Sequence, residues 1–472
     1  MASAEAIETL SFIKSGPGRR TFAYQGKGQR NPNRAARFVQ RPCYLSQVQS
    51  SRGGLVALRS RDFRYLISGH FLSLTGTQMQ HVAVVWQLYL FTHSPLSLGL
   101  LGLFRIAPVI LFAIGGGVIA DAFDRRRLML ISQTVLALVS LAFAVTTHLG
   151  WANVYSIYGL SFLAGAAVAV DNPTRQALVP LLVPREHLGN ALSIGALAWQ
   201  LASIVGPPIA GWMLATVGMV PIYVADSASF LAVIAALILI RHRAPARSAA
   251  QISLRSALEG LSFIRRSPLI LSTMLFDFFA TFFGGSMLLM PIFADQVLHV
   301  GTRGLGLLYS AQPVGASIAA AALSLLPLPR RQGLAILIAV ASYGAAIAIF
   351  GLSPYFWLSL LALAWSGASD AVSTVLRVTL RQMLTPDDLR GRMTSVNMMF
   401  FMGGPQLGEV EAGAVAKAFG ARFAVASGGI LCVLAAGFVA LISPELRRYR
   451  GVEAARSESP GSKMEEARPA SV

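Results

Sequence analysis

Several ionisable residues lie inside long apolar runs of this 472-residue chain, and five of them are candidates for chemistry. Charged side chains are expensive to place in such runs, so each is interpreted first as a functional group. A carboxylate there can bind and release a proton, and an arginine can form an ion pair with the deprotonated carboxylate. The chemistry available is therefore proton coupling, and the candidates are Arg105, Asp277, Asp370, Glu409 and Glu411.

Each candidate also has a structural interpretation. Glu409 and Glu411 are two positions apart, so on a helix they point in different directions and at most one should face a given arginine. A permanent buried ion pair that only specifies packing is the alternative to a proton switch. Asp277 lies among five phenylalanines between 276 and 283. An acid among aromatic rings is a candidate proton carrier, although the rings could equally face lipid.

Asp370, one of these candidates, and Asp226 also have nearby partners to consider. Asp370 could pair with Arg377 or Arg381, which follow it by seven and eleven positions in the same apolar run. Asp226 could hydrogen-bond only within its own part of the chain. Both are weaker candidates for proton coupling than Asp277, Glu409 and Glu411.

Polar side chains gather on the first apolar run, at 75–81. They are too many for a lipid-facing surface, so we predict that they line an internal cavity, with Gln78 and His81 as substrate contacts. A lone histidine is more often a hydrogen-bonded structural residue, and this alternative stays open for His81. Phe279 and Phe282 are the other candidates for the cavity wall.

A short turn between two apolar runs combines glycine, acid and base: residues 115–130 read GGGVIADAFDRRRLML. Glycine permits close helix approach, and arginine holds such a turn on the cytoplasmic side of a membrane. The turn could set topology alone, or it could act as a gate. Near the end of another run, Asp171 could pair with the arginines of the turn or with Arg175. The gate candidates are Gly117, Asp121, Arg125, Arg126, Arg127, Asp171 and Arg175.

The composition supports a membrane protein, because 54% of the residues are hydrophobic and only 13% are charged. About 20 consecutive apolar residues cross a bilayer, and lipid leaves backbone polar groups no partner outside a helix. We therefore predict an all-α membrane protein with twelve transmembrane helices. The predicted spans are 66–91, 97–120, 127–148, 153–174, 189–215, 219–240, 268–293, 304–326, 333–352, 355–380, 394–417 and 421–443.

The formal charge of +18 is explained by topology rather than by nucleic acid. Of the 20 lysines and arginines that lie between the tails in loops or at span ends, 17 fall on one side and three on the other. The basic side of a membrane protein is cytoplasmic, so both termini are predicted there. No basic domain stands free of the predicted spans, which argues against a nucleic-acid partner.

The sequence lacks the residues that disulfide, metal or ATP chemistry would require. The two cysteines, Cys43 and Cys432, make no disulfide framework or metal cluster. The sequence contains no phosphate loop of the GxxxxGK[ST] type, so ATP does not drive the protein directly. We predict no enzymatic activity, no cofactor and no metal.

The chain also repeats itself, because residues 174–193 align with 376–395 and pair Arg175 with Arg377. The duplication predicts two pseudo-symmetric six-helix halves with the substrate site between them. The predicted parts are a disordered basic cytoplasmic extension (1–60), the first half (61–240), a cytoplasmic linker with an amphipathic helix (241–267), the second half (268–443) and a disordered cytoplasmic tail (444–472).

Several stretches between about 60 and 443 resemble the major facilitator superfamily, within it a bacterial siderophore-exporter branch. They include GGVIADAFDRRR, RDFRYLISGHFLS, DNPTRQALVPLLVP, GPPIAG and RGRMTSV. The resemblance implies alternating access by rocking of the halves and a cytoplasmic latch at Asp121. It also implies that the spans of Arg105 and Glu409 flank the interface, which favours an Arg105–Glu409 or Arg105–Glu411 pair. Ala122 and Asp124 depart from the usual pattern of the turn.

These observations lead to one functional expectation. The chain is predicted to be a multi-pass protein of the bacterial inner membrane, a monomer whose partners are the bilayer, protons and a small amphipathic substrate. It would export a siderophore- or drug-like compound in exchange for protons. Uptake of a small solute, or a non-transporting sensor built on the same fold, are the alternatives.

Overall fold

The computed structural model describes residues 55–122, 124–240, 267–285, 287–327, 329–386 and 389–449, with the backbone alone at 112–122, 268, 390–392, 394–396 and 398–402. These described residues belong to one compact unit that begins at Leu55. They form helices and turns, with no strand among them. The fold class predicted from the sequence, all-α, is confirmed.

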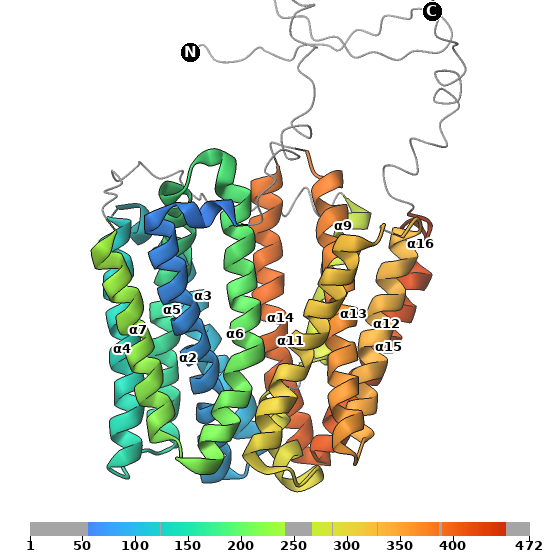
Figure 1. Ribbon diagram of the computed structural model, residues 1–472. Helices are drawn as coiled ribbons and strands as arrows, with labels where there is room; N and C mark the ends of the chain where they lie inside the picture. Colours follow the sequence, from blue (N-terminus) through green and yellow to red (C-terminus); the bar gives the residue numbers. More distant parts are fainter. Residues whose placement is uncertain are drawn as a thin grey trace, which may run out of the picture. The chain divides into compact units, whose positions relative to one another are not determined.

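Twelve long helices run between two ends of the described bundle (Figure 1). The first six, here called the first half, are α2 (Arg61–Thr92), α3 (Pro95–Ala122), α4 (Arg125–His148), α5 (Val154–Leu182), α6 (Leu188–Thr216) and α7 (Val220–Leu239). The other six, the second half, are α9 (Pro268–Phe283), α11 (Gly301–Leu325), α12 (Gln332–Leu352), α13 (Phe356–Leu384), α14 (Arg390–Phe419) and α15 (Ala421–Ile442).

Short helical pieces complete the described chain. The longest break in a span follows α9, where the chain continues through η4 (Met287–Leu289), α10 (Met290–Ile292) and the π-helical turn η5 (Phe293–Val297). The other pieces lie at one end of the bundle and are η2 (Val56–Arg59), η3 (Arg185–His187) and α16 (Pro444–Arg448).

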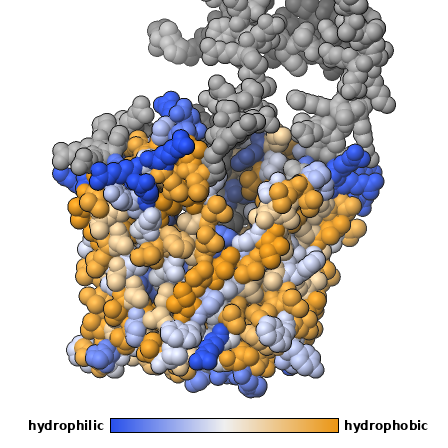
Figure 2. Space-filling model, viewed as in Figure 1, coloured by the Kyte–Doolittle hydropathy of each residue, from blue (hydrophilic) through white to orange (hydrophobic). Residues whose placement is uncertain are grey.

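Nine stretches of the described residues are long and apolar enough to cross a membrane. They contain every long helix except α2, α3 and α14. In α3 the stretch Pro95–Leu111 is apolar but shorter, and α2 carries the polar residues predicted at 75–81. The twelve-span prediction is consistent with this result. Hydrophobic residues cover the flank of the bundle in Figure 2, as expected of a surface in contact with lipid.

The arginine-rich ends of the helices gather at one end of the bundle, here called the basic end. Arg61 begins α2, Arg125 begins α4, Arg331 caps α12 and Arg447 lies in α16. The other end, called the opposite end, holds the turns at 92–95, 149–153, 217–219 and 353–355. A capping box between Asn153 and Ser156 begins α5 there.

The two halves use the same helix pairings. In the first half α2 packs on α6 and α7, α3 on α5, and α4 on α5 and α7. In the second half α9 packs on α14 and α15, α11 on α13, and α12 on α13 and α15. Matching helices in chain order therefore make matching contacts, as expected from a duplication.

Two pairs of long helices join the halves, α3 with α14 and α6 with α11. Each pair crosses at glycine. A Cβ built on Gly99 of α3 would lie 3.2 Å from the Cα of Gly413 in α14, and one on Gly211 of α6 would lie 3.1 Å from the Cα of Gly306 in α11. Any larger residue would push these helices apart, so the crossings depend on glycine.

The buried hydrophobic side chains are distributed unequally between the two ends. Toward the opposite end, one continuous cluster takes residues from both halves, including Val85, Leu101, Leu305 and Ala412. Toward the basic end, the described residues form separate clusters, one around Leu66 and Leu182 in the first half and others around Phe276 and Met274 in the second. Among the described side chains, the core that the two halves share lies toward the opposite end.

Candidate functional site

Four helices from both halves bring a group of polar residues together between the halves. Arg105 of α3 reaches across to α2, where its Nη1 contacts Nδ1 of His81. The ring of Tyr309 in α11 lies edge-on to the His81 ring, with 5.8 Å between ring centroids. Glu409 of α14 interacts electrostatically with Arg105 and with Tyr309. We call these four residues the central polar group.

The direct ion pair expected between Arg105 and a glutamate of α14 is not formed in this structure. The guanidinium is turned toward His81, whereas Glu409 Oε2 is within hydrogen-bond distance, 3.2 Å, of the side-chain amide of Gln406. Gly102 makes room for this carboxylate, since a Cβ there would lie 2.5 Å from Glu409 Oε2. Arg105 and Glu409 are thus neighbours that do not form an ion pair.

Only one of the two glutamates belongs to this group. Glu411 is half-buried and has no interaction with Arg105. The expectation that at most one of them faces the arginine agrees with this arrangement, because residues two apart on a helix lie about 200° apart.

Asp277 does not have the aromatic surroundings expected for it. Its carboxylate is buried against α13, where Oδ1 lies 3.0 Å from Nη2 of Arg377 and Oδ2 lies 3.2 Å from Nη2 of Arg381. The phenylalanines of α9 instead stack on one another, as Phe279 does on Phe283. The phenylalanines next to Asp277 in the sequence point in other directions from α9, whereas Arg377 and Arg381 reach Asp277 from α13.

This cluster contains a second acid and an unsatisfied arginine. Asp370 Oδ1 lies 3.6 Å from Nη2 of Arg377, so of the two partners considered for Asp370 the structure selects Arg377. Arg377 is 1% exposed, and its Nε and Nη1 atoms have no hydrogen-bond partner among the described residues. Two acids and two arginines leave the cluster neutral, which is typical of a structural ion-pair network.

In the first half, Asp171 pairs with Arg175 at 3.4 Å rather than with the arginines that begin α4. It also accepts hydrogen bonds of 2.8 Å from Ser132 and Gln133. Arg125 donates to the carbonyl of Ala177 instead.

The remaining gate candidates are only partly described. Arg126 donates to the carbonyl of Ile238 at 2.9 Å, and the backbone N–H groups of Arg126 and Arg127 donate to the side chain of Asp124, which caps α4. Asp124 therefore has a local structural role. Gly117 and Asp121 lie in the last turns of α3, where the side chains are outside the described residues.

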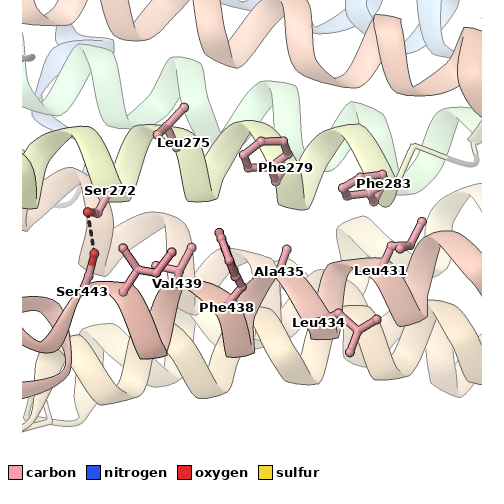
Figure 3. A pocket seen from close by; sticks show the side chains of 11 residues that line it. Ser272, Leu275, Phe279, Phe283, Leu431, Leu434, Ala435, Phe438, Val439 and Ser443 are labelled. Atoms are coloured by element: carbon pink, nitrogen blue, oxygen red, sulfur yellow. Dashed lines mark hydrogen bonds between the residues drawn. The ribbon is translucent and has the colours of Figure 1, made fainter.

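The residues predicted to line the cavity do not all lie in one place. Gln78 donates a 2.8 Å hydrogen bond to Ser203 of α6, and His81 belongs to the central polar group. Phe282 is half-buried beside Gly408 of α14. Phe279 points into an apolar groove between α9 and α15 in Figure 3, lined also by Leu434 and Phe438.

Neither Gln78 nor His81 lines the groove of Phe279. The side chains of Leu434 and Phe438 are 61% and 63% exposed, so it lies on the flank that faces hydrocarbon. In the first half, Asp226 behaves as expected: it is fully buried and bonds to Ser140 and Thr77.

One contact that joins the halves at the opposite end could not be selected from the sequence. Tyr89 of α2 donates to Asp295 Oδ2 of η5 at 2.5 Å, and Gln296 donates to the Tyr89 oxygen at 3.1 Å. Asp295 could have been noticed as an acid near the end of a predicted span. Tyr89 carries no comparable signal.

Comparison with known proteins identifies the architecture. A family model described as transmembrane secretion effector matches residues 52–467, which is most of the chain. The chain belongs to this family of the major facilitator superfamily. It is therefore a multi-pass membrane transporter that moves a small molecule, not an enzyme, as predicted.

Curated relatives include the enterobactin exporters of Escherichia coli O81 and of Escherichia fergusonii. Each is 27% identical over 388 residues, which cover 82% of this chain and 93% of the relative.

Solved structures show the same fold at low identity. A bacterial homologue of the human lysosomal transporter Spinster, inward-facing and occupied, superposes with a TM-score of 0.65 at 15% identity, covering 83% of this chain and 99% of the other. A bacterial homologue of ferroportin, also inward-facing, gives a TM-score of 0.61 at 17% identity, covering 80% and 98%.

Proposed function

We propose that this transporter exports a small amphipathic organic compound from the bacterial cytoplasm in exchange for protons. The observation that carries the proposal is the central polar group, in which Glu409 lies beside Arg105 without an ion pair between the halves. A carboxylate that can either pair with the arginine or take a proton is the element that proton exchange needs.

The basic end of the bundle is the cytoplasmic end in this proposal. The positive-inside rule places it there, and both termini with it. The core that the halves share at the opposite end then closes the periplasmic side. We interpret the structure as the state that loads cargo from the cytoplasm.

The exchange follows from two states of Glu409. A proton that enters from the periplasm neutralises the carboxylate and leaves Arg105 on His81. Release of that proton to the cytoplasm restores the charge, which attracts the guanidinium away from His81. Each change alters the contact between α3 and α14, one of the two helix pairs that join the halves, and so couples proton release to rocking.

Export is favoured over uptake by the relatives, which are named as exporters of enterobactin. The first compound to test is therefore enterobactin. Everted membrane vesicles carry the cytoplasmic face outward, and respiration acidifies their interior. An exporter that exchanges protons will dissipate this gradient when the compound is added, as measured with a pH-sensitive dye.

Three outcomes separate the alternatives. Accumulation in everted vesicles that is abolished by a protonophore supports proton-coupled export. Accumulation that persists with the protonophore contradicts the proton mechanism but keeps the exporter. Accumulation in right-side-out vesicles only indicates uptake, and no flux of any tested compound in either orientation favours the sensor alternative.

A further inference from the structure

A second polar site lies at the basic end of the first half, away from the central polar group. It is a cavity of about 220 Å³ between α2, α5 and α6. Its wall contains His70, Arg175, Gln176 and Trp199, and the apolar side chains Leu66 and Val179. A charged group, an aromatic ring and aliphatic side chains thus meet in one cavity.

The guanidinium of Arg175 is incompletely paired. Its Nη1 lies 3.4 Å from Asp171 Oδ2 and 3.4 Å from Nδ1 of His70, whereas Nη2 donates to Asn172 at 2.6 Å. Charge-assisted hydrogen bonds are normally 2.7–2.9 Å long, so the pair with Asp171 is a loose one. The Nε–H group has no partner among the residues that the structure describes.

Asp171 does not need Arg175 to satisfy it. Its Oδ1 already accepts 2.8 Å hydrogen bonds from Ser132 and Gln133. The side chain of Arg175 is 23% exposed, whereas that of Asp171 is 5% exposed. The cation therefore faces the cavity while its acid stays behind it.

The repeat supplies an internal comparison. Arg377 is the counterpart of Arg175 in the aligned segments. It is 1% exposed and lies 3.0 Å from Asp277 and 3.6 Å from Asp370. In the second half, the arginine is buried beside two acids. In the first half, the corresponding arginine lies in the wall of a cavity.

We propose that this cavity is a loading site for the anionic group of an amphipathic cargo, with an aryl carboxylate as the chemical class. Nε–H of Arg175 binds the carboxylate, and Trp199 with the aliphatic wall covers the ring. Ligand pockets for whole drug-sized molecules measure about 300–1,000 Å³, so this cavity takes one group of the cargo rather than all of it. The inference rests on the proposed export function, since it assigns the cytoplasmic entry of the same pathway.

Trp199 allows the site to be tested by binding alone. Anthranilate is a small aryl carboxylate that accepts energy from tryptophan, and 2-aminobenzamide is its neutral counterpart with the same ring. We expect the full-length protein in nanodiscs to bind anthranilate about tenfold more tightly than 2-aminobenzamide. Arg175→Gln should reduce the anthranilate affinity to that of the amide, and Arg175→Lys should restore part of it. Trp199→Phe should remove most of the sensitised emission.

Arg64→Gln is the matched control, because Arg64 is exposed on α2 at the same end and is outside the cavity. It should leave both affinities unchanged. Equal affinity for the two compounds, or an equal loss of both in Arg175→Gln, would overturn the loading site. Size-exclusion profiles identify a variant that fails to fold. If Arg175→Gln fails to fold, the affinities of Arg175→Lys for the two compounds are compared instead.

Binding needs no gradient, so this result is separable from the export proposal. Selective anthranilate binding without proton-driven flux refutes export alone. Proton-driven flux of cargo with no anion preference at Arg175 refutes the loading site alone.

Discussion

Tyr89 in α2 donates a 2.5 Å hydrogen bond to Asp295 in η5, and this bond joins the two halves at the opposite end of the bundle. Gln296 adds a second bond to the same tyrosine oxygen. Both partners in the second half lie on a π-helical turn, a form of backbone that is frequent at functional sites. In the proposed cycle this contact must break when the transporter opens to the periplasm.

Tyr89→Phe should therefore favour the periplasm-open state. A hydrogen bond to a charged group contributes about 1.5–3 kcal/mol, which corresponds to roughly a 10- to 150-fold shift between two states. Spin labels at Tyr155 of α5 and Lys417 of α14, both exposed near the opposite end, will report the separation of the halves.

The control for this variant is Tyr65→Phe, since Tyr65 lies at the basic end and its hydroxyl has one hydrogen bond among the described residues, accepted from Arg61. Both variants are made without Cys43 and Cys432. An unchanged distance distribution in Tyr89→Phe would show that the hydrogen bond does not hold the halves together.

The two glutamates of α14 should respond differently to neutralisation. Glu409→Gln is expected to lower proton-driven export at least tenfold, because Gln cannot exchange a proton beside Arg105. Exchange of labelled for unlabelled cargo, which needs no net proton movement, should persist. Flux in everted vesicles with and without a gradient measures both.

Glu411→Gln is the matched control on the same helix and should retain most of the gradient-driven flux. If the two variants lose it equally, the assignment of Glu409 to the central polar group has no functional meaning.

The ion-pair cluster of the second half should behave as a structural element. Asp277→Asn leaves Arg377 and Arg381 buried without their shared acid, and breaking a buried pair costs about 3–5 kcal/mol. We expect a markedly lower Tm in detergent. Asp370→Asn should have a smaller effect, because its side chain is 48% exposed and its contact with Arg377 is 3.6 Å.

Removal of the cation should partly compensate for removal of the acid. The double variant Asp277→Asn/Arg377→Leu is expected to recover part of the lost Tm. A normal Tm in Asp277→Asn together with lost gradient-driven flux would instead identify Asp277 as a proton carrier.

The sequence predicted the class of fold and the region of the site, but not its individual partners. Apolar runs and arginine placement depend on local composition, so the helices and their basic end could be derived from them. The direction of Arg105 could not, because His81 and Glu409 compete for it from two other helices. The partners of Asp277 could not be predicted for the same reason, because they belong to α13 and the residues next to Asp277 in the sequence point elsewhere.

The contact between Tyr89 and Asp295 could not be predicted from the sequence for a different reason. It depends on η5, where five residues leave the regular helical repeat. A pattern with a period of 3.6 residues carries no information about such a turn.

The glycine crossings of Gly99 with Gly413 and Gly211 with Gly306 have a mechanical consequence. Interlocked side chains would have to disengage each time the halves rotate, whereas bare backbones can slide over each other with little change in packing energy. Both crossings lie near the opposite end, on the two helix pairs that join the halves. Rotation of the halves is then opposed by the side-chain core that they share at this end and by polar contacts on either side, and protons and cargo can change the polar contacts.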